Sequence, residues 1–540
     1  MFLSFNRLLR LNTHVTKCFS LLMHCACTGN MPNYDSEEVV ASVSEIASLG
    51  SIYTQLSSSL VENKTYVQRM NNLVQFRKMI SENTSLIGEA LLIDLHQNDP
   101  TPHITDCLSE VEYMISNLAN LMKPKHVSSE ISVVNFPARA KIVPEPLGVV
   151  LIVGSWNYPF HTALGPVPGA LAAGNSILVK PGSLSRNSSR VMGELLVKYF
   201  PNGVIQCVQG GIETMTPLLT NSWGHVFFTG GTKIGKIIMD SCSKTLTPVT
   251  LELGGQNPCI VTACADIALA ARRIAWGKWA TNAGQVCLAP NHVIVDESVA
   301  HALITELKKC IEQFFPNGPE ADSNFCHIIS KSHKKRLCTL LERDSAYVET
   351  KSAILNDKNS LCLPPTIVDF KSDWNAFINS ACMENEIFGP ILPIVTYTNF
   401  HATVDKYLTT GITRNNAPLA LYVFSKSDAC ISAVTNTMAG TVVVNDTGMH
   451  IVERCLPFGG IGNSGIGCYH GKSTFDLFTH YKPILTKSGW MDIPFRYPPV
   501  SILGAKIVKF LLWLGRKEVT PLWIGKILLI LGLVYKVMKT

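Results

Sequence analysis

Hydrophobic and polar residues are arranged in two different patterns along the chain. Over residues 36–122 the apolar side chains recur every three or four positions, most clearly at 67–92, and this spacing predicts helices. Further on, short apolar runs rich in β-branched and aromatic residues alternate with helical stretches such as 189–200. Strand, helix and strand at this spacing predict an α/β fold with a parallel, doubly wound sheet. The expected strands span residues 149–153, 176–180, 204–208 and 225–228.

The C-terminal segment, residues 499–540, departs from this pattern. Between 519 and 535 nearly every residue is apolar, and a membrane span needs about 20 such residues. Lys526 interrupts the run, and an amphipathic stretch at 507–514 precedes it. Because the segment is terminal and has basic flanks, we expect an amphipathic helix and a hydrophobic tail that attaches the chain to a membrane. A buried core helix is the alternative.

Residues 1–35 form an N-terminal extension with a charge pattern of its own. The first 34 residues contain Arg7, Arg10 and Lys17 but no acidic residue, as is typical of transit peptides. Met31 could serve as an alternative initiator. A targeting segment and an unused extension are therefore equal alternatives.

Composition narrows the class of protein. The 540 residues, 46% hydrophobic and 16% charged, are enough for two or more domains. The net charge of +6 is small for this length and no basic stripe with interleaved aromatics is present, so nucleic-acid binding is not expected. The 17 cysteines lack the paired spacing of zinc sites, so we expect no metal and mostly buried, reduced thiols.

Two short frames contain the residues from which we expect chemistry. Glu252 lies in Thr-Leu-Glu-Leu-Gly-Gly, and Cys287, 35 positions later, ends Asn-Ala-Gly-Gln-Val-Cys. A thiol that bonds to carbon and a carboxylate that activates water are the two parts needed to oxidise an aldehyde through a thioester. The glycines let the backbone or a ligand approach closely. For either residue alone, a buried thiol or a carboxylate satisfied at a strand end is the alternative.

A glycine-rich stretch at 228–235 is the candidate phosphate site. It follows an expected strand and opens a helical stretch at 236–242, whose N-terminus would offer unpaired N–H groups to an anion. The usual dinucleotide fingerprint, Gly-x-Gly-x-x-Gly, occurs instead at 460–465, where no buried strand precedes it and no clear helix follows. We interpret 460–465 as a structural turn near the catalytic cleft.

Further motifs lie in order along the chain. They are Pro-Leu-Gly-Val-Val at 146–150, Gly-Ser-Trp-Asn-Tyr-Pro at 154–159, Glu-Ile-Phe-Gly-Pro at 386–390 and Pro-Phe-Gly-Gly at 457–460. Together with the two frames they resemble the aldehyde dehydrogenase superfamily, most closely its class 3 branch, which includes the fatty aldehyde dehydrogenases. The resemblance extends from about residue 42 to residue 499.

This resemblance implies a division of the chain. A helical N-terminal region and a doubly wound, Rossmann-like NAD-binding domain would occupy 36–252, and an α/β catalytic domain would occupy 253–440. Residues 441–498 would return to the cofactor domain and form a small oligomerisation arm.

The resemblance also implies the catalytic roles. Cys287 would attack the aldehyde, and the Asn157 side-chain amide with the Cys287 backbone N–H would hold the oxyanion. Glu252 would act as the general base for the water that hydrolyses the thioester. Relatives that pass the acyl group to coenzyme A or phosphate generally lack this base, so a free carboxylate product is expected.

For the cofactor, the resemblance assigns Lys180 and Glu386 to the two riboses and Phe388 to the nicotinamide end. Ser183 stands where the family often has a glutamate that repels a 2′-phosphate, so we expect NAD with NADP as an alternative. The other cofactor candidates are Trp156, Thr229, Gly230, Gly231, Gly235, Leu253 and Gly254, and the substrate candidates are Tyr158 and His450.

We therefore expect NAD(P)-dependent oxidation of medium- to long-chain aliphatic aldehydes to carboxylic acids. The enzyme would be a homodimer attached by its tail to a membrane, facing the cytosol, at the endoplasmic reticulum or, alternatively, the mitochondrion. A soluble or mitochondrial dehydrogenase of semialdehydes or aromatic aldehydes is the first alternative function. A non-catalytic scaffold with this fold is the second.

Overall fold

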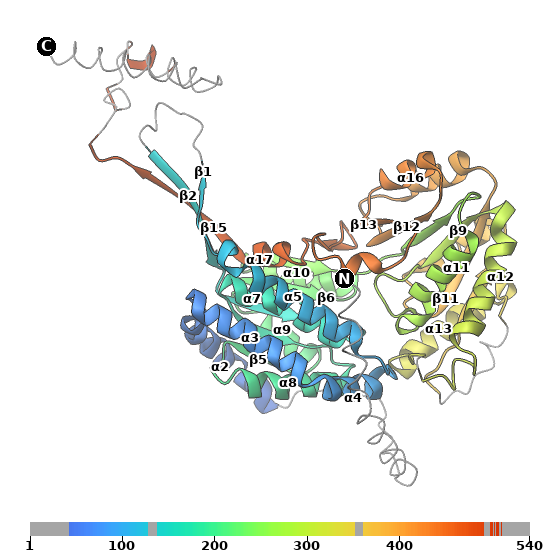
Figure 1. The fold of residues 1–540 in the computed structure, drawn as a ribbon, viewed down its shortest axis with the longest axis horizontal. Helices are drawn as coiled ribbons and strands as arrows, with labels where there is room; N and C mark the ends of the chain where they lie inside the picture. Colours follow the sequence, from blue (N-terminus) through green and yellow to red (C-terminus); the bar gives the residue numbers. More distant parts are fainter. Residues whose placement is uncertain are drawn as a thin grey trace, which may run out of the picture. The chain divides into compact units, whose positions relative to one another are not determined.

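The computed structural model describes residues 43–127, 138–323, 325–350, 360–490 and 497–499, with 502, 504–506 and 509 (Figure 1). The described residues belong to one unit, Glu38–Thr540. The predictions made for residues 1–35 and for the apolar run at 519–535 lie outside the described residues. Among the residues that are described, no helix has both the length and the apolar character to cross a membrane.

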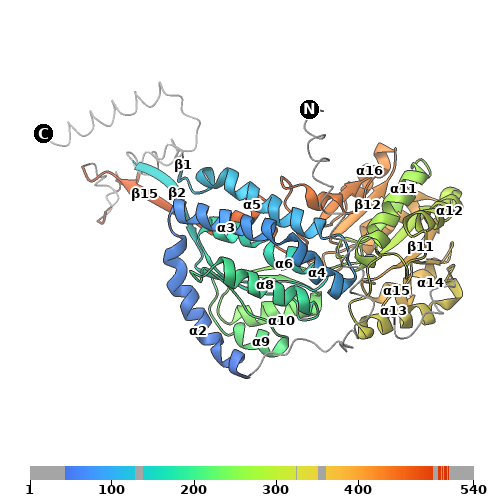
Figure 2. The ribbon, with the colours of Figure 1, turned by 60° about the horizontal axis from the view of Figure 1, so that its bottom comes forward.

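Four helices begin the described chain, in agreement with the three- and four-residue spacing of its apolar positions. A capping box between Thr65 and Gln68 starts the second of them, and left-handed His96, with φ of 55°, ends the third. Pro102 lies in the first turn of the fourth, where a missing N–H costs little. Helices α3 and α5 pack side by side in Figure 2. The helices are α2 (Val43–Ser59), α3 (Tyr66–Glu82), α4 (Thr84–Leu95) and α5 (Thr101–Leu121).

The first six-stranded sheet has the order β14-β7-β6-β3-β4-β5. Strands β3 to β7 all pair in parallel, and only the short edge strand β14 is antiparallel. The predicted α/β fold with a parallel sheet is therefore confirmed, and the strand expected at 204–208 is shorter than predicted. The strands are β3 (Val149–Val153), β4 (Ser176–Lys180), β5 (Ile205–Cys207), β6 (His225–Thr229), β7 (Val249–Glu252) and β14 (Gly465–Ile466).

Alternate residues of these strands face two different helical layers. In β3, Leu151 belongs to an apolar cluster with Leu56 of α2, whereas Ile152 belongs to the cluster that contains Phe76 of α3 and Val111 of α5. Burial on both faces explains why such strands read as unbroken apolar runs. The helices that connect the strands are α6 (Pro159–Leu164), α7 (Val167–Ala173), α8 (Arg186–Tyr199), α9 (Ile212–Leu218) and α10 (Thr232–Ser243).

The second six-stranded sheet is parallel throughout, with the order β10-β11-β9-β8-β12-β13. Helices α11 and α12 pack against each other beside it, as Figure 1 shows. The strands are β8 (Pro258–Val261), β9 (His292–Asp296), β10 (Thr366–Asp369), β11 (Ile391–Tyr397), β12 (Ala420–Phe424) and β13 (Thr441–Val444). The helices are α11 (Ile267–Ala275), α12 (Glu297–Phe314), α13 (Lys331–Arg343), α14 (Trp374–Ile378), α15 (Ala381–Glu384) and α16 (Asp428–Thr435).

A three-stranded antiparallel sheet joins segments that are far apart in sequence. Its strand β15 pairs with β2 from Thr479 opposite Pro146 to Lys487 opposite Ala138, and most of β15 is exposed. Before it, the chain forms β14 and α17 (Lys472–Leu477), so residues after 460 return to the edge of the first sheet beside Glu252. The strands are β1 (Lys125–Val127), β2 (Ala138–Pro146) and β15 (Thr479–Lys487).

Candidate active site

A cavity of about 1130 Å³ collects most of the predicted site residues. Its walls come from the carboxyl ends of strands in the first sheet, from α5 and α13, from the segment that leads into β9, and from residues 448–458. Cys287, Glu252 and Asn157 all line it. The other predicted residues that line it are Trp156, Tyr158, Thr229, Gly230, Gly231, Leu253, Gly254, Glu386 and Phe388.

The loop that leads into Cys287 has a strained backbone. Asn282, Ala283 and Gly284 have consecutive positive φ values of 48°, 48° and 74°. A Cβ at Gly284 would also lie 2.4 Å from the carbonyl oxygen of Gly389, so glycine is required there. Strain of this kind persists only where surrounding contacts enforce it, and it is typical of functional loops.

Two buried amide side chains enforce the shape of this loop. Gln285 accepts a hydrogen bond from the backbone N–H of Ile329 at 3.1 Å. Asn257 donates to the carbonyl oxygens of Cys287 and Ala289, at 2.6 and 3.1 Å. Neither Asn257 nor Gln285 was among the predicted site residues. Their only signal in the sequence is that each lies within five residues of Glu252 or Cys287.

Cys287 is half-buried at the cavity wall, near two carboxylates. Burial, with the nearby carboxylates of Glu386 and Glu252, raises the pKa of the thiol to about 12. The backbone N–H groups of Cys287 and Leu288 favour the thiolate and partly oppose this rise. The thiol is therefore protonated at neutral pH in this structure, and a base must accept its proton before the sulfur can attack.

Asn157 is held so that its amide faces the same loop. Its Oδ1 accepts from the hydroxyl of Ser155 at 2.6 Å, which sets the orientation of the amide group. Its Nδ2 donates to the carbonyl of Gln285 at 2.8 Å. The amide nitrogen carries two hydrogens, and this bond uses one of them. Because Gln285 is only two residues before Cys287, the bond holds the Asn157 amide close to the loop that carries Cys287. This geometry suits a donor to a developing oxyanion.

Glu252 ends strand β7 and is 4% exposed. Its backbone lies between two neighbours, opposite Thr229 of β6 and Gly465 of β14. Neither carboxylate oxygen has a hydrogen-bond partner among the described residues, and burial raises the pKa of the group well above its usual value. An unpartnered buried carboxylate is costly for the fold, so its position at a cavity wall indicates a role in chemistry.

The end of the cavity at helix α10 fits a dinucleotide. Gly231 precedes the 12-residue helix and gives it no side-chain cap, so the first backbone N–H groups are left for an anion. Within the described part of the chain, no atom lies within 4 Å of where a Cβ at Gly231 would stand, which leaves room for a phosphate. The predicted phosphate loop therefore has the expected context, although its helix begins four residues earlier than the helical stretch expected at 236–242.

The nicotinamide end of the predicted site contains Glu386, Phe388 and Trp156. A Cβ at Gly254 would lie 2.0 Å from the carboxylate of Glu386, so only glycine fits beside it. Burial raises the pKa of Glu386 to about 7, opposed by a hydrogen bond from the backbone N–H of Gly255. Phe388, with φ of 49°, meets Trp156 edge to face with ring centroids 5.4 Å apart. These groups can hold a ribose and an aromatic ring.

Lys180 and Ser183 do not line the cavity. Lys180 is the buried last residue of β4, and its carbonyl accepts from the N–H of Gly154 at 2.9 Å. Ser183 lies in the half-buried turn that follows. Lys180 therefore lies beside the 154–159 motif, and Gly182, the residue before Ser183, lies against the backbone of Trp156 in that motif.

Gly235 and His450 also lie outside the lining of the cavity. A Cβ at Gly235 would lie 2.7 Å from the side chain of Leu253, so this glycine lets α10 pack against the end of β7. His450 stacks on Phe458 with ring centroids 6.0 Å apart, and burial lowers its pKa to about 4. Its neighbours Met449 and Ile451 line the cavity instead.

Comparisons with known proteins identify the family of the chain. The model of the aldehyde dehydrogenase family matches residues 56–484. The Mus musculus protein "Aldehyde dehydrogenase family 3 member A2" is 38% identical over 450 residues, which cover 82% of this chain and 90% of that protein. The Canis lupus familiaris protein "Aldehyde dehydrogenase, dimeric NADP-preferring" is 37% identical over 438 residues, with 80% and 93% coverage. Among solved structures, substrate-bound Staphylococcus aureus AldH matches with a TM-score of 0.79 and 34% identity, covering 86% of this chain and 99% of that one.

Proposed function

The chain belongs to the aldehyde dehydrogenase family, and from this premise we propose which aldehydes it oxidises and which residues perform each step. It is an aldehyde dehydrogenase that uses NAD(P). Our proposal is that it converts medium- to long-chain aliphatic aldehydes into free carboxylic acids. The observation that supports the mechanism is that Cys287, Asn157 and the unpartnered carboxylate of Glu252 line one cavity.

Covalent catalysis begins at Cys287. As its sulfur bonds to the carbonyl carbon, the substrate oxygen gains negative charge, and the Asn157 amide is placed to donate to that oxygen. Glu252 shares the cavity and has no hydrogen-bond partner within the described part of the chain, so it is available to receive the thiol proton. Burial raises the pKa of both groups, and the charge of Glu252 adds to the rise at Cys287.

Hydride departure leaves an acyl thioester on Cys287. Once it has given up the thiol proton, Glu252 removes a proton from water and the water oxygen attacks the thioester carbon. The carbon–sulfur bond breaks to give the acid and the Cys287 thiolate, which takes the proton back from Glu252. Because a base is present at this position, hydrolysis is favoured over transfer of the acyl group to coenzyme A or phosphate.

When bound, NAD(P) supplies the hydride acceptor. We assign its pyrophosphate to the N-terminus of α10 at Gly230 and Gly231, and its nicotinamide ribose to Glu386. On the adenosine side, Ser183 has no negative charge with which to repel a 2′-phosphate. The proposed preference for NAD therefore leaves NADP as an alternative cofactor.

The substrate proposal rests on the apolar walls beyond Cys287. At the rim, Met449 and Val452 are 43% and 52% exposed. Each methylene of a substrate that is buried against such walls gains about 0.8 kcal/mol, or about fourfold in affinity. KM should therefore fall as the aldehyde chain lengthens, until the substrate covers the apolar walls. The apolar residues that line this part are Pro102, Trp276, Val286, Met449, Ile451, Val452 and Phe458.

The proposed location and assembly follow from the same reading. Aldehydes of this length partition into lipid, and the apolar run at 519–535 would attach the enzyme to a membrane, facing the cytosol, at the endoplasmic reticulum. We propose a homodimer because the dog relative is named as dimeric. Sedimentation of the intact chain with vesicles, with and without residues 499–540, tests the attachment.

NADH formation with saturated aldehydes of two to sixteen carbons tests the function. We expect kcat/KM to rise with chain length, and activity to vanish in Cys287→Ala but to persist in Cys362→Ala, a buried thiol outside the cavity. Equal activity in Cys287→Ala would overturn the mechanism. Activity confined to short or aromatic aldehydes would keep the mechanism and overturn the substrate proposal.

A further inference from the structure

A buried charged cluster adjoins the cavity and has no part in the proposed steps. Arg454 forms ion pairs with Asp106 and with Glu110, the latter at 3.2 Å, and all three side chains are almost fully buried. Nδ1 of His161 lies 3.2 Å from Oδ2 of Asp106, and its Nε2 lies 3.3 Å from the hydroxyl of Tyr469. The cluster joins α5, α6 and the segment 454–471. Burying so many charges is costly, which calls for a functional explanation.

Three members of this cluster reach the cavity. Asp106, His161 and Tyr469 line it together with Glu252 and Cys287. After burial, the charges of Glu252 and Cys287 are the strongest influences that raise the pKa of the Tyr469 hydroxyl, so this hydroxyl lies within electrostatic reach of both.

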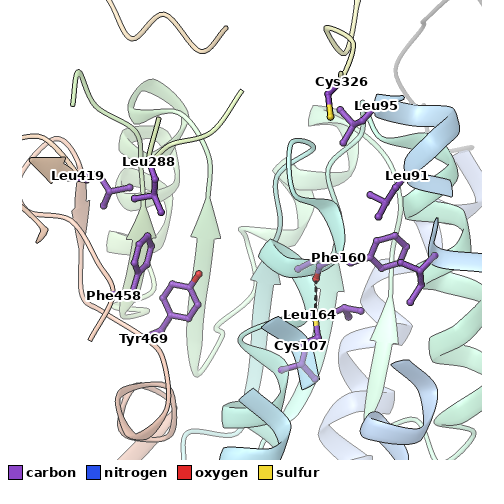
Figure 3. Packing of buried hydrophobic residues seen from close by; sticks show 14 of the residues in the cluster. Leu91, Leu95, Cys107, Phe160, Leu164, Leu288, Cys326, Leu419, Phe458 and Tyr469 are labelled. Carbon is purple, nitrogen blue, oxygen red and sulfur yellow. Dashed lines mark hydrogen bonds between the residues drawn. The ribbon is translucent and has the colours of Figure 1, made fainter. Parts of the chain in front are cut away.

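Tyr469 is held firmly in this position. Its backbone exchanges two hydrogen bonds with Phe458, at 2.8 and 2.9 Å, and its ring meets those of Phe458 and Phe227 edge to face. Figure 3 shows Tyr469 and Phe458 in the packing cluster that also contains Leu288, the residue after Cys287.

Glu252 needs an exit for its proton. In each turnover the attack of Cys287 leaves its thiol proton on this carboxyl, which is buried and has no hydrogen-bond partner among the described residues. That proton must leave before Glu252 can accept one from water. We propose that Tyr469, His161 and Asp106 form a relay that carries this proton away from Glu252, with Arg454 holding Asp106 in place. The relay rests on the proposed thioester hydrolysis.

The transfer balances in protons and charge. Protonated Glu252 passes its proton through cavity water to the oxygen of Tyr469, while the proton of the tyrosine moves to Nε2 of His161. His161 gives up the proton on its Nδ1 to Asp106, whose carboxylate returns it to water in the cavity mouth. The Nδ1 to Oδ2 distance is within ion-pair range, but the two atoms are not aligned as a hydrogen bond, so the ring must turn for this last transfer.

The electrostatics suit a proton acceptor at His161. Burial, with a further contribution from Arg454, lowers the pKa of this imidazole, and Asp106 opposes the change, so the ring is neutral at neutral pH and can accept a proton. Burial raises the pKa of Glu110 to about 7, so this carboxyl, on the other side of Arg454, also changes charge near neutral pH. The titratable and charged groups that face His161 are Asp106 and His103 of α5 and Arg454, Tyr469 and His470 of the C-terminal segment.

Tyr469→Phe breaks the relay with the least change in volume. We expect the first-turnover burst of NADH to keep its rate while the steady-state rate falls at least about tenfold, because hydride transfer precedes the blocked step. Added imidazole should restore part of the steady-state rate by carrying protons in place of the hydroxyl. Tyr199→Phe is the matched control, since its buried hydroxyl bonds to Glu82 at 2.7 Å outside the cavity.

His161→Gly tests the second member by a different readout. Imidazole should raise its steady-state rate severalfold without changing its burst, which a merely structural role would not produce. Burst and steady state falling together in Tyr469→Phe, or both rates staying within twofold of wild type, would overturn the relay. If His161→Gly does not fold, Tyr469→Phe alone decides. Failure of the wild type to form NADH from any of the aldehydes would instead overturn the proposed function.

Discussion

The proposed nucleophile and the proposed base of this enzyme are held in opposite ways. Cys287 ends a loop with three consecutive positive φ values, and Asn257 binds its carbonyl oxygen. Glu252 has an equally fixed backbone between β6 and β14, yet its carboxylate contacts no hydrogen-bonding group among the described residues. Surrounding contacts fix the position of Cys287, whereas no hydrogen bond from the described residues fixes the side chain of Glu252.

The difference follows from what each group must do. A nucleophile forms one bond in one direction, so backbone strain that fixes its position lowers the entropic cost of attack. A base that serves both the thiol and the hydrolytic water must keep its lone pairs free, and a hydrogen bond that oriented it would also occupy it. The cost to the fold is therefore backbone strain in the loop before Cys287 and loss of hydration at the carboxylate of Glu252.

Glu252→Gln should break the comparison most strongly. Thioester hydrolysis should slow by about 10²- to 10⁴-fold, and mass spectrometry should find an acyl group retained on Cys287.

The same variant should also change how stability depends on pH. A raised pKa means that Glu252 stabilises the fold only at acid pH, and this contribution is lost as pH rises. The variant should therefore be about 1–3 kcal/mol more stable than wild type at pH 7, in urea unfolding, and no more stable below pH about 4. Equal or lower stability at pH 7 would contradict the description of Glu252 as unpartnered.

Gly284→Ala should disturb the strained loop that positions Cys287. The added methyl meets the Gly389 carbonyl oxygen at 2.4 Å and the φ of 74° disfavours alanine, so we expect about 2–4 kcal/mol lower stability and at least about tenfold lower activity. Gly318→Ala is the control, because Gly318 has a φ of 81° but no atom of the described residues lies within 4 Å of an added Cβ. Matched losses in the two variants, measured by thermal unfolding, would show that backbone strain alone accounts for the effect.

Asn257→Ala should separate positioning from stability. It removes hydrogen bonds to Cys287, Ala289 and Ala420, and Asn175→Ala removes an equal number elsewhere in the core. Both should lose about 2–3 kcal/mol of stability, but only Asn257→Ala should lower kcat, by about tenfold. A similar kcat loss in both variants would mean that the loop is not held by Asn257 in any special way.

The pH dependence of the NADH burst should show the smallest effect and sharpen the comparison. With the pKa of Cys287 raised to about 12, the burst rate should rise through pH 7 to 9 without a plateau. The rise should be steeper in Glu252→Gln, approaching tenfold per pH unit, because no carboxylate then accepts the thiol proton. A plateau near neutral pH in both proteins would mean that Cys287 is already a thiolate.

Local pattern was sufficient for the strands and for naming candidate reactive residues. Strands 149–153 and 176–180 could be predicted because burial on both faces makes every position apolar, whereas Cys287 and Glu252 stay candidates that their glycine-rich frames single out. The segment 460–465 was interpreted as a turn. The structure adds β14, which begins at the last residue of this segment and pairs Gly465 with Glu252. A two-residue strand has no sequence pattern of its own.

The sequence by itself determined the fold class, the family and the identity of the chemical groups, because periodicity and short motifs are local properties. Only the tertiary structure decided how those groups are held. Asn282 and Ala283 adopt positive φ through contacts with distant residues, and nothing in their own side chains requires it. Asp106 and Arg454 are 348 residues apart, and their buried pairing beside the cavity exists only because α5 and the returning C-terminal segment pack together.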